Sequence, residues 1–363
     1  MPRPRLMSET PESRHLLVRL VAVIATILVF AALHVTSWVT STLALAFFVT
    51  VAVWPVDAFL RNRLPERLRW AGHVAALALV ILLFSLFLGG VFLAARQIVA
   101  GLPAYEDTIA STLRQGTAWA GIPDIADEAG GMETARLFER MMGIATGIVR
   151  STSNLAGILS LIFFLVLLML IEAPSWAGKM QSLTGKRDGQ AYRAALLAIA
   201  TRIRWYFAVR TFMGLATGVL YALWSWAWNL DFVFVWGLLA FLLSYVPNVG
   251  SLVAGVLPAA FAFLQLESFS AILYGLGLLL IEQVMGNYAD PKLQGRELAL
   301  SPLVILVALM VWSWIWGIAG MLVAVPMTLV VMIVFARIPA LQPIALFLSS
   351  KRDVDDLMQS VDA

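Results

Sequence analysis

The chain contains no cysteine, and both histidine and charged residues are scarce in it. Without a thiol, a disulfide, a thiolate nucleophile and a cysteine-ligated zinc site are all excluded. The histidines stand near the ends of apolar runs without metal-ligand spacing between them, so zinc and triad chemistry are poorly supported; they are His15, His34 and His73. No other nucleophile–base or metal constellation is visible in the sequence. We therefore predict no metal, no cofactor and no enzymatic activity.

Apolar residues dominate instead. They make up 61% of the chain, whereas charged residues make up 13%, and the mean hydropathy is +0.87. A soluble domain has about 25% charged residues. Several separate segments reach the roughly 20 apolar residues that a membrane-spanning helix requires. We predict an all-α integral membrane protein with about six full spans, at residues 16–38, 40–60, 71–95, 154–173, 205–228 and 268–286.

The net charge of +3 does not indicate a nucleic-acid partner, because the basic residues gather at span ends. Such residues usually report orientation, with the positive side cytoplasmic. Arginine and lysine dominate residues 1–19, 61–69 and 174–204, whereas acidic residues outnumber basic ones in 96–150. This pattern predicts a multi-pass membrane protein with both termini in the cytoplasm.

The same segments define the expected organisation of the chain. Residues 96–150 contain two amphipathic helical patterns around a loop at 121–131, and they serve as a connector, an external gate or an oligomer contact. The segment 174–204 is expected to begin as a loop and continue as a helix. The predicted units are a cytoplasmic tail (1–15), three spans (16–95), an extracytoplasmic helical segment (96–153), a fourth span (154–173), a basic cytoplasmic segment (174–204), a transport core (205–337) and a cytoplasmic tail (338–363).

Two apolar stretches are too long for one crossing. Residues 232–266 and 302–337 would form helices of about 52 Å and 54 Å, whereas the hydrocarbon core is about 30 Å thick. Turn-forming residues interrupt both stretches, so we predict a broken helical hairpin in each, re-entrant or fully spanning, opening from opposite sides. Trp312, Trp314 and Trp316 indicate that the second turn lies near a membrane interface. The hairpin and turn residues are Pro247, Gly250, Pro258, Pro291, Gly295, Gly317, Gly320 and Pro326.

A few polar residues inside the apolar part are candidates for a site, since paired interrupted segments are the best sequence indication of a transporter's binding site. Glu282 is a candidate coupling group, because an ionisable residue in a span is costly, although it could simply reach the interface. Arg210 either snorkels to the inner leaflet or pairs with Glu282 or with a substrate carboxylate. The candidate solute-binding residues are Asn248, Ser251, Gln283 and Asn287.

Two motifs in this region resemble those of the AI-2E transporter family, also called PerM-type permeases. The first is GLATGVLYALWSWAWNLDFVFVWGLLAFLLSYVPNVGSLVAGVLPA, and the second is MGNYADPKLQGRELALSPLVILVALMVWSWIWGIAGMLVAVP. Two positions depart from the family pattern: Ser244 replaces an asparagine, and Met285 replaces a glutamate, with Glu282 three residues earlier. The resemblance implies transport of small solutes, with autoinducer-2 as the best-known proposal and sodium/proton antiport proposed for other relatives. It also implies paired hairpins like those of elevator-type carriers, and homo-oligomers.

Three functional hypotheses follow. The first is a secondary carrier for a small polar solute such as an autoinducer-2-like signal, and the resemblance implies that it works in the direction of export. Its partners are the lipid bilayer, a small-molecule or ion substrate and further copies of the chain. The alternatives are a sodium or lithium/proton antiporter, and an oligomeric channel or membrane scaffold. No P-loop pattern is present, so proton or ion coupling, with Glu282 as the titrating group, is expected to drive transport.

Overall fold

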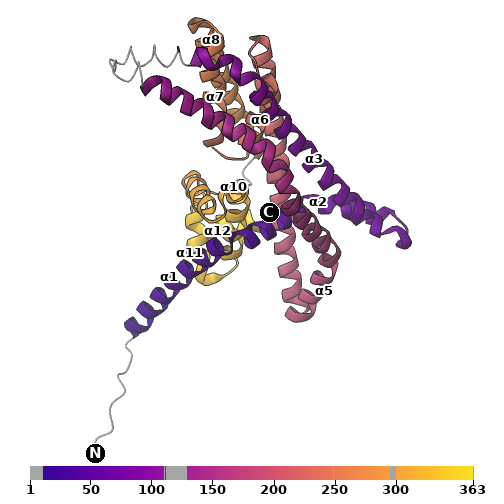
Figure 1. Ribbon diagram of the computed structural model, residues 1–363. Helices are drawn as coiled ribbons and strands as arrows, with labels where there is room; N and C mark the ends of the chain where they lie inside the picture. The colour runs from indigo at the N-terminus through magenta and orange to yellow at the C-terminus, as the bar shows by residue number, and fades with distance from the viewer. Residues whose placement is uncertain (1–10, 110, 112–128, 248, 295–299, 363) are drawn as a thin grey trace, which may run out of the picture.

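The fold is almost entirely helical over the residues that are described. A computed structural model describes residues 11–109, 111, 129–247, 249–294 and 300–362. Within these ranges there is no strand, and Leu300 and Ser349 form an isolated bridge. The helices (Figure 1) are α1 (Pro11–Val35), α2 (Ser37–Arg63), η1 (Glu66–Leu68), α3 (Trp70–Gly101), η2 (Leu102–Tyr105), α5 (Ala129–Ala227), α6 (Val233–Leu243), α7 (Val249–Gln265), α8 (Ser268–Glu282), η4 (Gln283–Ala289), α9 (Asp290–Gln294), α10 (Pro302–Ala336), η5 (Pro339–Leu341), α11 (Gln342–Leu348) and α12 (Val354–Asp362).

The prediction of an all-α integral membrane protein is confirmed. Five helical segments among the described residues are long and apolar enough to cross a membrane. They are Ser37–Arg63, Glu66–Ile109, Leu196–Ala227, Ser268–Ala289 and Pro302–Ala336. The expected first and fourth spans correspond to shorter apolar helical segments, Leu20–Val35 and Gly157–Ala173.

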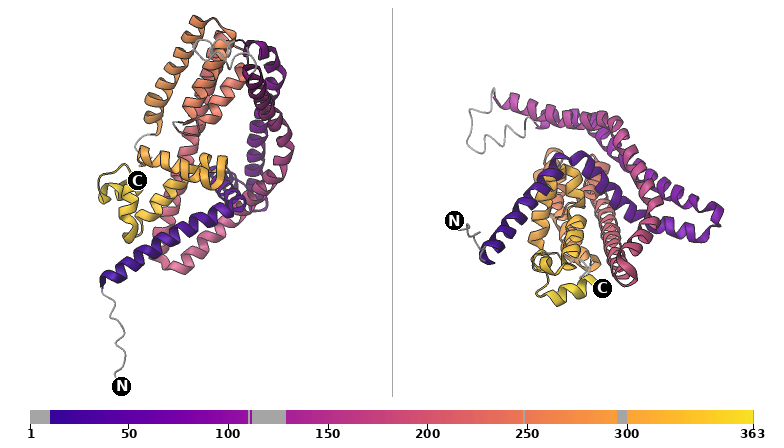
Figure 2. Two further views of the ribbon diagram at one scale, coloured as in Figure 1. Left: turned by 60° about the vertical axis from the view of Figure 1, so that its left-hand side comes forward. Right: turned by 90° about the horizontal axis from the view of Figure 1, so that it is seen from below.

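Helix α5 differs from the expectation over residues 173–190. The sequence predicted a loop there, whereas α5 extends over 99 residues, from Ala129 to Ala227, and includes the place where the chain reverses direction. The ribbon turns back on itself between its two apolar portions (Figures 1 and 2). No proline follows Pro174 within α5, and the glycines of this stretch cost about 1 kcal/mol each. Helix can therefore continue from both apolar portions toward the place where the ribbon reverses.

The first interrupted stretch folds as a helical hairpin. α6 ends at Leu243, α7 begins at Val249, and the turn between them includes Pro247. The amide of Gly250 donates to the carbonyl of Val246 at 2.9 Å, which brings the start of α7 close against the end of α6. Pro258 does not form part of the turn, because it lies buried inside α7. Membrane helices tolerate an interior proline where neighbouring groups satisfy the freed carbonyl.

The second interrupted stretch also reverses direction. α10 is broken at Gly317, whose φ of 60° and ψ of −136° are accessible to glycine only. Trp312 Nε1 donates to Thr328 Oγ1 at 3.1 Å, a contact that a straight helix cannot make between residues 16 apart. Gly320 lies at the close approach of the two arms. Pro326, expected at the break, is instead buried inside the second arm.

The tryptophans of the second hairpin contact other parts of the protein. Trp312 and Trp316 are buried within the protein, and only Trp314 is largely exposed. Trp316 donates to Thr40 Oγ1 of α2 at 2.9 Å, and Trp314 stacks on His34 of α1 with 4.6 Å between ring centroids. Trp314 and Trp316 thus contact α1 and α2, whereas Trp312 contacts the second arm of its own hairpin.

We expect Gly320→Ala to destabilise the second hairpin. A Cβ atom there would lie 1.8 Å from the carbonyl oxygen of Trp312, so the two arms would have to separate. Overpacking of this kind costs about 1–3 kcal/mol, which thermal unfolding of the detergent-purified protein would detect as a lower Tm. Gly89→Ala is the matched control, because a Cβ at Gly89 meets nothing within 4 Å. Equal Tm values for the two variants would contradict the close packing of the arms.

Helix α5 connects three buried apolar clusters. It packs with α2 and α3 through Val166, with α6, α7 and α8 through Tyr221, and with α2 and α10 through Ile203. Figures 1 and 2 show α6–α8 at one end of the molecule and α10–α12 at the other, with α2, α3 and α5 alongside. Helices in a bilayer associate by close packing rather than by hydrophobic exclusion. The first hairpin is therefore positioned by direct contact with α5.

Candidate functional site

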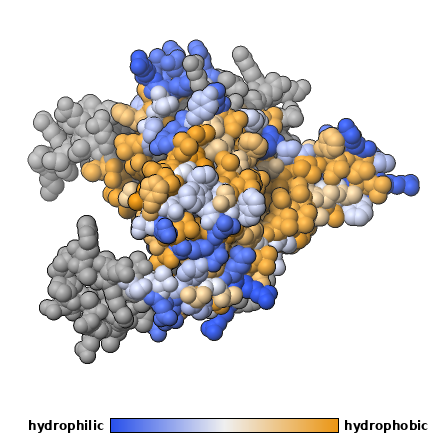
Figure 3. All heavy atoms as spheres, turned by 90° about the horizontal axis from the view of Figure 1, so that it is seen from above, coloured by the Kyte–Doolittle hydropathy of each residue, from blue (hydrophilic) through white to orange (hydrophobic). Residues whose placement is uncertain are grey.

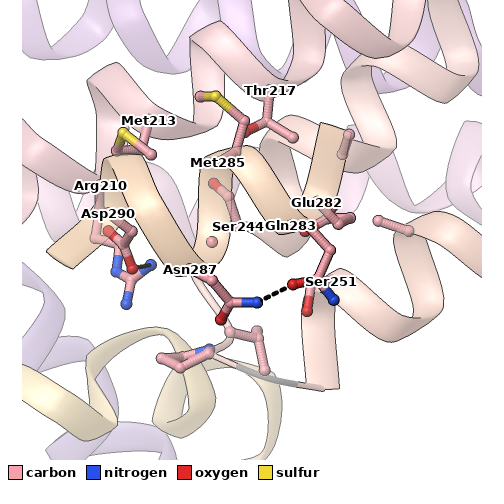
Figure 4. Close-up of a pocket in the computed structure, with 15 residues that line it drawn as sticks. Arg210, Met213, Thr217, Ser244, Ser251, Glu282, Gln283, Met285, Asn287 and Asp290 are labelled. Atoms are coloured by element: carbon pink, nitrogen blue, oxygen red, sulfur yellow. Dashed lines mark hydrogen bonds and ion pairs between the residues drawn. The ribbon is translucent and has the colours of Figure 1, made fainter. Parts of the chain in front are cut away.

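A cavity of about 250 Å³ lies where α5, the first hairpin and the α8–α9 segment meet (Figure 4). Its position follows from a close contact of two glycines: a Cβ on Gly218 of α5 would lie 2.6 Å from the carbonyl oxygen of Gly237 of α6. Small residues of this kind let membrane helices approach closely. The lining residues are Arg210, Met213, Thr217, Ala240, Ser244, Val246, Pro247, Ser251, Ala254, Glu282, Gln283, Met285, Gly286, Asn287 and Asp290.

One wall of the cavity is an irregular helix. Residues Gln283–Ala289 form a π-helix, η4, which continues α8 into α9. Longer π-helical stretches are rare, and shorter ones occur frequently at functional sites. Sequence reasoning identified a polar, turn-rich segment here but not this conformation. The polar residues within this span were the only sequence signal for an irregular backbone. Irregular backbone is tolerated at membrane depth where a cavity or neighbouring protein groups satisfy its N–H and C=O groups.

An ion pair closes one side of the cavity. Arg210 Nη1 of α5 lies 3.3 Å from Asp290 Oδ2 of α9, and their side chains are 14% and 19% exposed. The hypothesis that Arg210 pairs with Glu282 is therefore wrong. The Nε atom of Arg210 is buried and has no hydrogen-bond partner among the described residues. The sequence placed Asp290 only in a turn, because the residues around Asp290 do not reveal that it faces Arg210, which is 80 positions away.

Glu282 is bound to α5 in a different way. The hydroxyl of Tyr221 donates to Glu282 Oε1 at 2.8 Å. Tyr221 is fully buried, and the sequence did not mark it, since a tyrosine on an apolar helix is usually a packing residue. Over the part of the chain that is described, no cation lies within ion-pair distance of Glu282. The Glu282 carboxyl group is therefore held by this hydrogen bond and not by an ion pair with a described residue.

Three of the predicted solute-binding residues line this one cavity. Ser251 comes from α7, and Gln283 and Asn287 from η4, where the side-chain amide of Asn287 donates to Gln283 Oε1 (Figure 4). Asn248 and Gly295 lie outside the described residues, and Pro291 is in α9.

The two positions that depart from the family motifs, Ser244 and Met285, also line the cavity. Ser244 Oγ donates to the carbonyl of Phe241 at 2.7 Å. A shorter hydroxyl and a thioether therefore stand where the family pattern has an amide and a carboxylate. Both changes alter the chemistry of the wall at positions that a bound solute would meet.

The cavity combines polar groups with an apolar wall. Its carboxylates, guanidinium, amides and hydroxyls can donate to and accept from a hydroxylated solute, whereas Met213, Ala240 and Ala254 supply apolar contact. Convergent polar groups in an apolar concavity are typical of small-molecule sites. The described residues include no group of three His, Asp or Glu side chains placed to hold a metal ion. The arrangement suits reversible binding of a small polar molecule.

Comparison with known proteins identifies the family of this chain. The profile described as AI-2E family transporter matches residues 20–340. The chain belongs to the AI-2E transporter family. It is 31% identical to the AI-2 transport protein TqsA of Escherichia coli (strain K12) over 84% of this chain and 88% of that protein. It is also 26% identical to a protein of Haemophilus influenzae, over 93% and 97% of the two chains, and 26% identical to YhhT of Escherichia coli (strain K12), over 88% and 91%; both are named as transport proteins.

Family membership makes this AI-2E protein a multi-pass membrane transporter. The matched region covers both hairpins and every described residue of the cavity. The two motifs that carry the resemblance include the α6–α7 turn and residues 285–290 of the α8–α9 segment, and both of these segments line the cavity.

Proposed function

We propose that this AI-2E family protein is a secondary carrier that exports a small polar solute through the cavity between α5, α7 and η4. The observation that carries the proposal is the convergence of Ser251, Gln283 and Asn287 with two carboxylates at the break points of membrane helices. An autoinducer-2-like signal is the first candidate solute, since the relative TqsA is named as an AI-2 transport protein.

The cavity performs this task by replacing water around the solute. A polar molecule loses its hydration on entering a bilayer, and unpaired buried polar groups are costly. The amides of Gln283 and Asn287 and the hydroxyl of Ser251 offer hydrogen bonds in place of that water. A volume of about 250 Å³ admits a small solute with few heavy atoms rather than a peptide or lipid. Alternating access then requires one hairpin-bearing element to move against α5.

A proton gradient is the proposed driving force, with Glu282 as the group that carries the proton. A carboxylate at membrane depth without a cationic partner is costly when ionised, so it can exchange protons during a transport cycle. The same feature favours a second candidate function, a sodium or lithium/proton antiporter, in which the cation replaces the proton on Glu282. If the protein shows no saturable transport, an oligomeric channel or a membrane scaffold remains as its function.

The proposed setting is the bacterial inner membrane, with both termini in the cytoplasm and several copies of the chain in one assembly. The clusters of arginine at residues 1–19 and 61–69 support the orientation. No ATP is required, in keeping with the absence of a P-loop pattern from the sequence. The protein is expected to have no enzymatic activity.

Proteoliposomes test the proposal directly. We expect reconstituted protein to move autoinducer-2 with saturable kinetics, faster when a pH gradient is imposed, because the cavity holds one small solute at a time. Asn287→Leu should raise the apparent KM, since it replaces a hydrogen-bonding amide with an apolar side chain. Thr146→Val, outside the cavity and bonded only within its own helix, is the control. Sodium flux without autoinducer-2 flux would favour the antiporter, and no saturable flux of either would exclude both carriers.

A further inference from the structure

The joined end of α2 and α3 projects from the body of the protein as an arm that turns at η1 (Figures 1 and 3). In the space-filling view the arm is apolar along its length and polar at its end. Phe59 and Trp70 are 55% and 61% exposed just inside that polar end. Exposed aromatic side chains followed by charge are typical of the level at which a helix leaves the hydrocarbon region.

The interior of the arm's end is held together by a buried carboxylate. Asp57 of α2 is fully buried, with His73 Nδ1 of α3 at 2.9 Å and Arg61 Nη1 at 3.5 Å. Gly72 gives the Arg61 side chain room to cross between the helices, because a Cβ there would lie 2.6 Å from Arg61 Cγ. The charge of Arg61 is therefore engaged inside the arm, and the end of the arm has a defined shape.

The other arginines of this end point outward with their charge largely uncompensated. Arg63 and Arg67 are exposed, and neither has a carboxylate within ion-pair distance among the residues described. The guanidinium of Arg63 lies 4.2 Å from the centroid of the Phe59 ring, which holds it at the level of the aromatic side chains. Arg69 pairs with Glu66 at 3.3 Å, but both side chains are more than half exposed, so water screens this pair.

We propose that Arg63 and Arg67 form a binding site for the headgroup of an anionic phospholipid in the leaflet that the arm faces. Arginine is well suited to phosphate oxygens, because its guanidinium donates two parallel hydrogen bonds. The apolar flank of the arm accommodates acyl chains directly beside these donors, so the ligand approaches from the bilayer. This arrangement favours a lipid over a soluble anion or a soluble protein. The site is separate from the cavity and does not depend on which solute is transported.

Lipid retention on the full-length, detergent-purified protein tests the site. We expect native mass spectrometry to show preferential retention of phosphatidylglycerol over phosphatidylcholine with the same acyl chains. Arg63→Gln/Arg67→Gln should reduce that preference about 25-fold at low salt, at roughly fivefold for each arginine near a membrane surface. High salt should reduce the preference of the wild-type protein in the same direction.

The control removes the same charge elsewhere. Lys351→Gln/Arg352→Gln lies in the C-terminal segment and should leave the lipid preference unchanged. Thermal unfolding of both variants should match the wild type, since Arg63, Arg67 and Arg352 are exposed, Lys351 is half-buried, and none of the four forms an ion pair with a described residue. Equal retention of the two lipids by the wild type, an unchanged preference in the arm variant, or an equal loss in the control would each overturn the proposal. Binding of another protein to the arm, without any preference between the two lipids, would also overturn the proposal.

Discussion

Replacing Glu282 with glutamine is expected to abolish pH-driven transport while sparing exchange of solute down its own gradient. Glutamine keeps the size of the side chain and can still accept the 2.8 Å hydrogen bond from Tyr221. It cannot take up or release a proton, so the cycle loses its coupling step. In proteoliposomes the stimulation by an imposed pH gradient should disappear, and the apparent KM for the solute should change little.

The control for this variant is Glu267→Gln, at the other end of the same helix. Glu267 is exposed, makes no side-chain cap of α8 and lies outside the cavity, so its loss removes the same charge without touching the site. Its transport should keep the pH stimulation of the wild type. If Glu282→Gln keeps that stimulation as well, Glu282 is not the coupling group and the drive must come from another ion.

Arg210→Met is expected to lower both the stability of the protein and its transport rate by a large factor. The variant removes the guanidinium that lies 3.3 Å from Asp290 Oδ2, on a side chain that is only 19% exposed. Breaking a buried pair by removing one partner typically costs about 3–5 kcal/mol, because the remaining charge is not solvated. α9 should then detach from α5 and open the cavity on that side. Thermal unfolding in detergent and solute flux in proteoliposomes measure the two effects.

A double variant separates the ion pair from the size of the side chain. Arg210→Met/Asp290→Asn removes both charges, so most of the lost stability should return even if transport does not. Arg69→Gln is the matched control, since its partner Glu66 is 84% exposed and such pairs contribute little. Arg210→Met with a wild-type Tm would show that the pair does not hold α9 in place.

Which features could be predicted from sequence depends on how local their causes are. Gly317 was expected at a turn because 302–337 is too long for one crossing, and its φ of 60° places the break there. Pro258 and Pro326 carried the same signal but lie inside helices. A proline alone cannot tell whether neighbouring groups satisfy the carbonyl that it frees. That depends on how α7 and α10 pack.

The candidate site shows the same limit. Ser251, Gln283 and Asn287 were recognised because polar residues in apolar segments are conspicuous. Their partners were not recognised, since Tyr221 looks like a packing residue and Asp290 like a turn residue. The burial of Trp312 and Trp316 likewise depends on where α2 and the second arm of the hairpin lie.

The sequence by itself determined that this is an α-helical membrane protein with two interrupted apolar stretches, because segment length against bilayer thickness is a property of the chain alone. Its motifs also identified the transporter family. Only the tertiary structure decided that Asp290, rather than Glu282, neutralises Arg210, and that Tyr221 binds Glu282. Charge pairing falls off within a few ångströms, and those distances are set by how α5 packs against segments that are remote in sequence.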